Sequence, residues 1–93
     1  MSWNHRVVFD PVSKYFGIRE VYYDHLGAIT SGTHNDVTPT AETVGGLIHD
    51  LSRFIGAASK PILMEDSSGS QVKLREMSRA EIEAIDIRYN EGE

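Results

Sequence analysis

The chain has 93 residues, enough for one domain, and its formal net charge of −5 at pH 7 lies mostly in its last third. Residues 61–93 hold eight acidic and four basic side chains, so direct binding to nucleic acid, which needs clustered Lys and Arg, is not expected. The chain contains no cysteine, which excludes disulfides and thiolate-bound metals.

Three strands are predicted in the first third of the chain. Residues 5–10 alternate in the way that favours a strand, and the following Asp-Pro step ends it. Tyr15–Tyr23 gives the strongest strand pattern, because aromatic and β-branched residues dominate it. Gly27 suits the left-handed position that closes a short hairpin, and residues 28–33 form the returning strand. This spacing predicts an antiparallel meander.

A polar segment, GTHNDVTPT at residues 32–40, connects the meander to a helix. Asn35 and Asp36 favour a turn in which their side chains bond nearby backbone groups. Thr38 or Thr40 is expected to cap the helix, and Pro39 suits its first turn.

The helix is predicted from apolar residues that recur with helical spacing. They form one stripe, which we expect to pack on the sheet, and Gly45 and Gly46 interrupt the helix at a cost of about 1 kcal/mol each relative to Ala. A close approach of the helix to the sheet would explain these glycines. The stripe consists of Val44, Leu47, Ile48, Leu51, Phe54, Ile55 and Ala58.

The last third of the chain predicts shorter elements. PILMED at residues 61–66 indicates a fourth strand or an extended edge, DSSGS at 66–70 a flexible turn, and VKLREM at 72–77 a short strand. Ser78 and Glu81 have the spacing of a capping box at the start of a second, short helix. Residues 72–89 either fold back over the tyrosine-bearing face of the sheet or leave it open.

These elements predict an α+β fold for residues 1–93 as a single domain. We expect a three- to four-stranded antiparallel sheet with one main amphipathic helix packed on one face and a short C-terminal helix.

Three motifs in the first two thirds of the chain resemble a group of short bacterial and phage proteins. Trp3, Asn4 and Arg6 with Val7 and Val8 fit W-N-x-R-V-V, residues 20–27 fit E-V-Y-Y-D-x-x-G, and residues 60–63 fit K-P-(I/V)-L. The resemblance covers about residues 3–63, so residues 64–93 extend beyond it. That group has no established activity, and the resemblance therefore implies a fold and not a function.

Function is predicted as binding to another protein, without catalysis. An inhibitor of a host defence complex carried by a phage or mobile element, of the anti-CRISPR kind, is one concrete form. An exposed tyrosine-rich sheet surface is a common binding surface, and an acidic segment suits a basic partner. The expected contacts are Tyr15, Tyr22, Tyr23, Glu81, Glu83 and Asp86.

No enzyme activity, metal or cofactor is expected, because no catalytic constellation stands out. The first ten residues lack the apolar region of a signal peptide, and no run approaches the roughly 20 apolar residues of a membrane span, so a cytoplasmic protein without membrane contact is expected.

Two alternatives remain open at this point. One is a small metal- or ligand-binding protein that uses His34, Asp36 and His49, although a metal site needs three or four converging ligands and this spacing does not demand convergence. The other is a purely structural homodimer, assembled through the tyrosine face or a strand edge.

Overall fold

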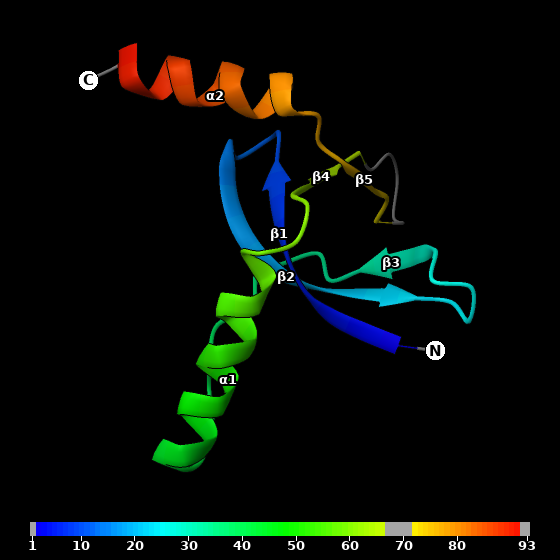
Figure 1. Ribbon diagram of the computed structural model, residues 1–93, viewed down its shortest axis with the longest axis vertical. Helices are drawn as coiled ribbons and strands as arrows, with labels where there is room; N and C mark the ends of the chain where they lie inside the picture. Colours follow the sequence, from blue (N-terminus) through cyan, green and yellow to red (C-terminus); the bar gives the residue numbers. More distant parts are fainter. Residues whose placement is uncertain (1, 67–71, 92–93) are drawn as a thin grey trace.

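The computed structural model describes residues 2–66 and 72–91 and has an α+β fold built on one curled, five-stranded sheet (Figure 1). The strand order across the sheet is β3-β2-β1-β4-β5. The elements in chain order are β1 (Ser2–Asp10), β2 (Tyr15–Tyr23), β3 (Ile29–Gly32), α1 (Val44–Ala57), β4 (Leu63–Glu65), β5 (Leu74–Glu76) and α2 (Arg79–Glu91).

The first three strands form the predicted antiparallel meander. β1 and β2 pair along their whole length, and β2 has the predicted bounds. Gly27 has a φ of 84° at the second turn, as expected for a left-handed position. The carboxylate of Asp24 closes this turn by accepting from the amides of Leu26 and Ala28, at 2.8 Å and 3.0 Å.

The other side of the sheet corrects the prediction of three to four strands that are all antiparallel. β4 pairs with β1 in parallel, with Val8 opposite Leu63, and β5 then pairs with β4 in the antiparallel sense. The chain passes through α1 before it reaches β4, and such a crossover allows a strand to join in parallel. Three-residue strands carry too little periodicity to reveal their direction in the sequence.

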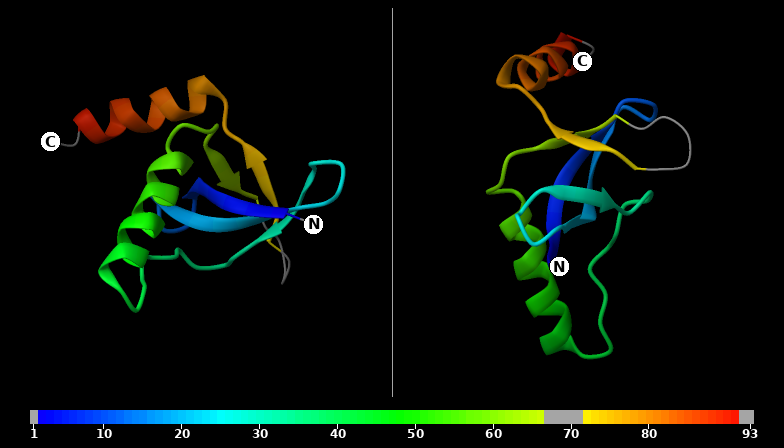
Figure 2. Two further views of the ribbon diagram at one scale, coloured as in Figure 1. Left: turned by 60° about the horizontal axis from the view of Figure 1, so that its bottom comes forward. Right: turned by 90° about the vertical axis from the view of Figure 1, so that its right-hand side faces the viewer.

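The core lies inside the curl of the sheet. Val8, Val21 and Leu63 are fully buried there, packed against the half-buried Ile29 and Leu74 and against Tyr23. The curl brings the two edge strands, β3 and β5, close together (Figure 2). The segment beyond residue 63 therefore contributes a strand and core side chains to this single sheet.

Two buried arginines, Arg6 and Arg19, lie directly opposite each other on β1 and β2. Like charges at such positions repel, so each needs its own acceptors. Arg6 donates to the Tyr23 hydroxyl at 2.8 Å and to the Pro61 carbonyl at 2.7 Å. Arg19 forms ion pairs with three carboxylates from separate segments, those of Asp10, Asp36 and Glu65.

The helix α1 begins later than predicted. Thr43 is its N-cap, and its hydroxyl accepts from the amide of Gly46 at 3.0 Å, so the expected caps Thr38 and Thr40 are wrong. A Cβ at Gly46 would lie 3.0 Å from that hydroxyl oxygen, which explains this glycine by its own cap. A Cβ at Gly45 would meet no described atom within 4 Å. Close approach to the sheet therefore explains neither glycine.

The contact between α1 and the sheet is narrower than predicted. Phe54 places its ring 4.5 Å from that of His5 on β1, and Ala57 is fully buried. The rest of the predicted stripe does not pack on the sheet, which corrects the expected layout. Figure 1 shows that α1 is inclined to the sheet, so that its N-terminal half lies away from the strands.

The second helix, α2, starts with the predicted capping box. The amide of Glu81 donates to the Ser78 hydroxyl at 3.2 Å, and the amide of Ser78 donates to the Glu81 carboxylate at 2.9 Å. In Figures 1 and 2, α2 extends beyond the sheet and does not lie over either of its faces. Most of the predicted turn at 66–70 lies outside the described residues. No described helix is long and apolar enough to cross a membrane.

Candidate functional site

The three tyrosines predicted to contact a partner do not form one surface. Tyr15 and Tyr23 lie on the side of β2 that carries Val21, and Tyr22 lies on the opposite side, because side chains alternate along a strand. Tyr15 and Tyr23 are at opposite ends of β2. Tyr15 is 75% exposed at the first hairpin, whereas Tyr22 and Tyr23 are half-buried.

The hydroxyls of Tyr22 and Tyr23 are engaged inside the protein. Tyr23 donates to the side-chain oxygen of Asn4 at 2.7 Å and accepts from Arg6. Tyr22 donates to the carboxylate of Glu20 at 2.8 Å. This hydrogen bond raises the pKa of the Tyr22 phenol above its usual value, because it favours the protonated form.

The predicted acidic contacts differ in their surroundings. Glu81 forms two hydrogen bonds with the guanidinium of Arg75, at 2.8 Å and 3.0 Å. These bonds, together with the amide of Ser78, lower the pKa of Glu81 to about 2. Glu83 pairs with Arg79 at 3.2 Å on the exposed side of α2. Asp86 is also exposed, so Glu83 and Asp86 are accessible while Glu81 holds the start of the helix.

The residues of the metal-binding alternative are not brought together as a ligand set. His34 lies exposed in the loop before α1, and His49 is exposed on α1 itself. Asp36 reaches Arg19 at 3.4 Å instead of closing the turn that we predicted for it. Within residues 2–66 and 72–91, no three His, Asp or Glu side chains are grouped in a way that could hold a metal ion.

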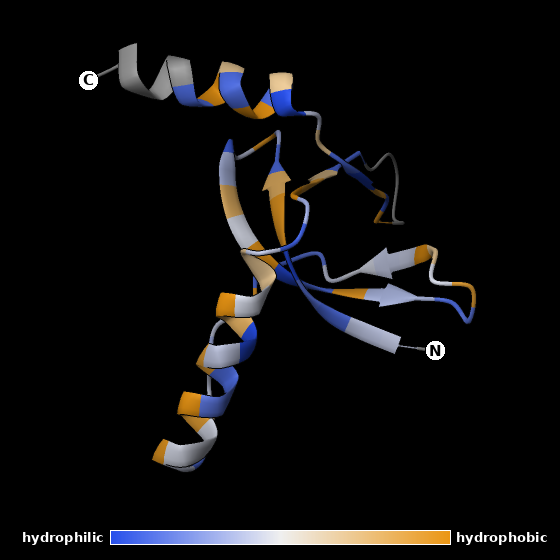
Figure 3. Cartoon of the chain, viewed as in Figure 1, coloured by the Kyte–Doolittle hydropathy of each residue, from blue (hydrophilic) through white to orange (hydrophobic). Residues whose placement is uncertain are grey.

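The most unusual surface is a row of apolar side chains along α1, which we call the α1 stripe. Figure 3 shows apolar residues on the side of the helix turned away from the sheet. Large contiguous apolar patches are uncommon on the surface of monomeric proteins. The α1 stripe consists of Val44, Leu47, Ile48, Leu51 and Ile55, which are exposed by 75%, 36%, 59%, 42% and 74%.

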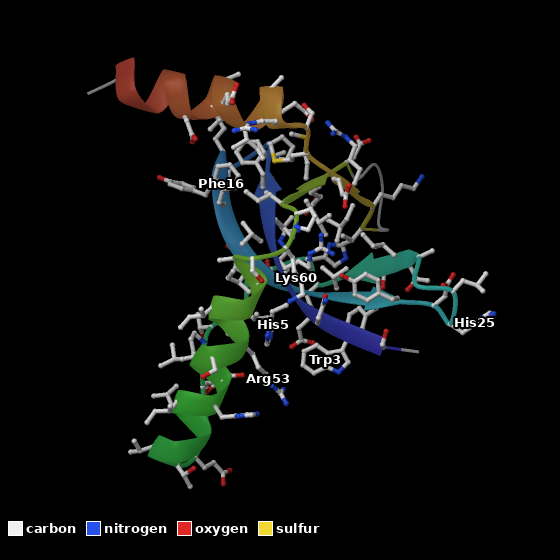
Figure 4. All side chains as sticks on the ribbon, viewed as in Figure 1. Trp3, His5, Phe16, His25, Arg53 and Lys60 are labelled. Atoms are coloured by element: carbon white, nitrogen blue, oxygen red, sulfur yellow. The ribbon has the colours of Figure 1, made fainter. Side chains whose placement is uncertain are left out.

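An open pocket, the Trp3 pocket, lies in the angle between α1 and the N-terminal half of β1 (Figure 4). Its volume is about 410 Å³. The ring of His5 meets that of Trp3 edge-on at 5.4 Å, and the guanidinium carbon of Arg53 lies 6.0 Å from the Trp3 ring centre. The pocket is lined by Trp3, Asn4, His5, Arg53, Gly56 and Lys60.

Comparison with protein-family models, curated proteins and solved structures finds no match to this chain. The resemblance to short bacterial and phage proteins therefore stays a prediction.

The sequence predicted the apolar row of α1 but not its exposure. It also did not predict that Arg53 and Lys60 lie near Trp3. It identified the apolar row of α1 and assigned it to the core. Trp3 and His5 lie two residues apart on β1 and therefore share one side of the strand. The sequence held no signal for the pocket, because Lys60 follows the end of α1 at Ala57 and its place near Arg53 depends on how the chain turns there. The angle between α1 and β1 brings Arg53 and Lys60 close to Trp3 and His5.

Proposed function

We propose that the protein is a non-catalytic protein-binding module whose main contact surface is the α1 stripe. The observation that supports this is that the apolar row is exposed on α1, while another side of the same helix already packs on β1. Such a row suits the mode in which an amphipathic helix lies in an apolar groove of its partner. The spacing of Val44, Leu47 or Ile48, Leu51 and Ile55 matches the anchors of that mode.

The helix is formed before any partner binds, which favours affinity. Thr43 caps its first turn, and Phe54 and Ala57 hold its C-terminal half against β1. The amide of Thr40 in the preceding loop also donates to the carboxylate of Asp50 at 3.1 Å. A surface that is ordered in advance loses less conformational entropy on binding.

One concrete form of this function is inhibition of a host defence complex by a phage or mobile-element protein. The small size and acidity of the chain support it. In such a complex the exposed Tyr15, Glu83 and Asp86 would be secondary contacts on a basic partner surface.

The test compares two matched double variants. Ile48→Glu with Ile55→Glu places charges in the α1 stripe, while Val12→Glu with Leu26→Glu places the same charges at exposed turn positions. Each protein is used for affinity capture from a bacterial lysate and for light scattering. We expect a stoichiometric partner, or a second copy of the chain, with wild type and with the turn variant, and none with the stripe variant.

Two outcomes would contradict the proposal. One is a wild-type protein that captures no stoichiometric partner and is a monomer. The other is a partner that the stripe variant retains but that is lost on changing Tyr15, Glu83 and Asp86, because the contact surface would then lie elsewhere. Circular dichroism is recorded for each variant to check that it keeps the wild-type fold.

A further inference from the structure

We infer that the Trp3 pocket binds a small phosphorylated molecule, with its phosphate held between Arg53 and Lys60 and the remainder of the molecule against Trp3. This inference does not depend on the α1 stripe. Arg53 lies on another side of α1 from the stripe, as its spacing from Ile48 and Ile55 requires, and Lys60 follows the end of the helix at Ala57.

The charge balance of the described residues points to an anion in this pocket. Most of the arginines elsewhere have carboxylate or carbonyl partners: Arg6, Arg19, Arg75 and Arg79. In contrast, neither Arg53 nor Lys60 has a described carboxylate within ion-pair distance, and no described carboxylate lines the pocket. Arg53 and Lys60 therefore place two positive charges in one pocket of a chain whose net charge is −5.

Both cations keep donors for a ligand. The ammonium of Lys60 donates once, to the carbonyl of Gly56 at 3.2 Å, which leaves two of its three N–H groups. This bond also offsets the negative end of the α1 dipole, which would otherwise repel an anion. The guanidinium of Arg53 makes a cation–π interaction with Trp3, which uses none of its N–H donors. These N–H groups form a planar fork that matches phosphate oxygens.

The size and composition of the pocket favour a phosphate ester over a free ion. A volume of about 410 Å³ falls in the range of small-molecule sites and exceeds what one phosphate fills. Trp3 is 47% exposed, so its ring offers apolar surface to the organic part of a ligand. His5, which is buried between Trp3 and Phe54, supports this wall. Two cations favour a dianionic phosphate over a single carboxylate.

Trp3 is the single tryptophan of the chain, so its fluorescence reports directly on the pocket. The full-length protein is titrated at constant ionic strength with phenyl phosphate, inorganic phosphate and benzoate. We expect a saturable change with phenyl phosphate, weaker binding of inorganic phosphate and weaker binding of benzoate. Arg53→Gln and Lys60→Gln should each weaken phenyl phosphate binding roughly tenfold or more, the loss typical of one charge-assisted hydrogen bond.

Arg79→Gln is the matched control, because Arg79 is an exposed arginine that pairs with Glu83 on α2. It should leave phenyl phosphate binding unchanged, as should the stripe variant with Ile48→Glu and Ile55→Glu. The inference is overturned if wild type gives no saturable change up to about 10 mM, an affinity too weak for a useful site. It is also overturned if benzoate binds as tightly as phenyl phosphate, or if Arg79→Gln weakens binding as much as Arg53→Gln.

Discussion

Arg19 is the residue that ties most segments of the chain together. Its guanidinium reaches carboxylates from the end of β1, the loop before α1 and β4. Gly17 makes room for one of these, because a Cβ there would lie 2.3 Å from the carboxyl carbon of Asp36. Only a residue without a side chain allows Asp36 to lie over β2. A buried arginine is thus accommodated by charges and a glycine far apart in the sequence.

Glu81 carries the clearest pH dependence at the residue scale. Its pKa of about 2 in the folded protein is below the ordinary value of 4.5, so its stabilising effect is complete above about pH 4.5 and is lost as the pH falls toward 2. We expect NMR titration of the Glu81 carboxyl to show a midpoint near 2. Arg75→Gln should raise that midpoint, because Arg75 is the largest cause of the shift.

Arg79→Gln again serves as a control, since it removes a neighbouring arginine that pairs with Glu83 and not with Glu81. A wild-type midpoint close to 4.5, or equal effects of Arg75→Gln and Arg79→Gln, would contradict this account of the capping box.

At the scale of elements, α1 is a helix with two different environments. Its C-terminal half carries Phe54 and Ala57 against β1, and its apolar stripe faces outward. The same apolar periodicity would be expected of a helix fully packed on a sheet. Substitutions at two adjacent residues, one in each environment, therefore distinguish the packed side of α1 from its exposed side.

Phe54→Ala and Ile55→Ala form such a neighbouring pair. Phe54→Ala should lower the free energy of unfolding by about 1.5–3 kcal/mol, because it removes apolar area buried against His5. Ile55→Ala should change it by less than about 0.5 kcal/mol, since Ile55 is 74% exposed. Urea unfolding measures both values. A large loss with Ile55→Ala in the isolated protein would mean that the stripe is already covered.

At the scale of the whole molecule, stability depends on the curl that brings β3 toward β5. Gly32 on β3 sits where a Cβ would lie 2.8 Å from a methyl of Leu74 and 3.1 Å from the carbonyl of Glu20. The first neighbour is a flexible side chain, but the second is backbone and cannot move without disturbing the pairing of β2. The closure of the sheet therefore requires a small residue at this position.

A pair of glycine substitutions tests this closure. Gly32→Ala should lower the free energy of unfolding by about 1–2 kcal/mol through overpacking. Gly45→Ala should raise it by up to about 1 kcal/mol, because the added methyl meets open space and alanine favours the helix. Thermal unfolding of both variants checks the opposite signs. A neutral Gly32→Ala would show that the strand edges are not in close contact.

Local features of this protein were predictable from the sequence because their causes lie within a few residues. The bounds of β2 follow from a dense run of aromatic and β-branched residues. The left-handed Gly27 and the Ser78–Glu81 capping box follow from short-range geometry in the same way. The apolar row of α1 was equally visible, since it depends only on helical spacing.

The tertiary structure decided which of these features meet and which face water. It set the parallel direction of β4 relative to β1. It also turned the apolar row of α1 outward and placed Arg53 beside Trp3. Helical periodicity fixes that residues share a side of α1, but the angle at which α1 leaves β1 fixes what that side touches. That angle depends on contacts between residues distant in sequence, such as His5 and Phe54.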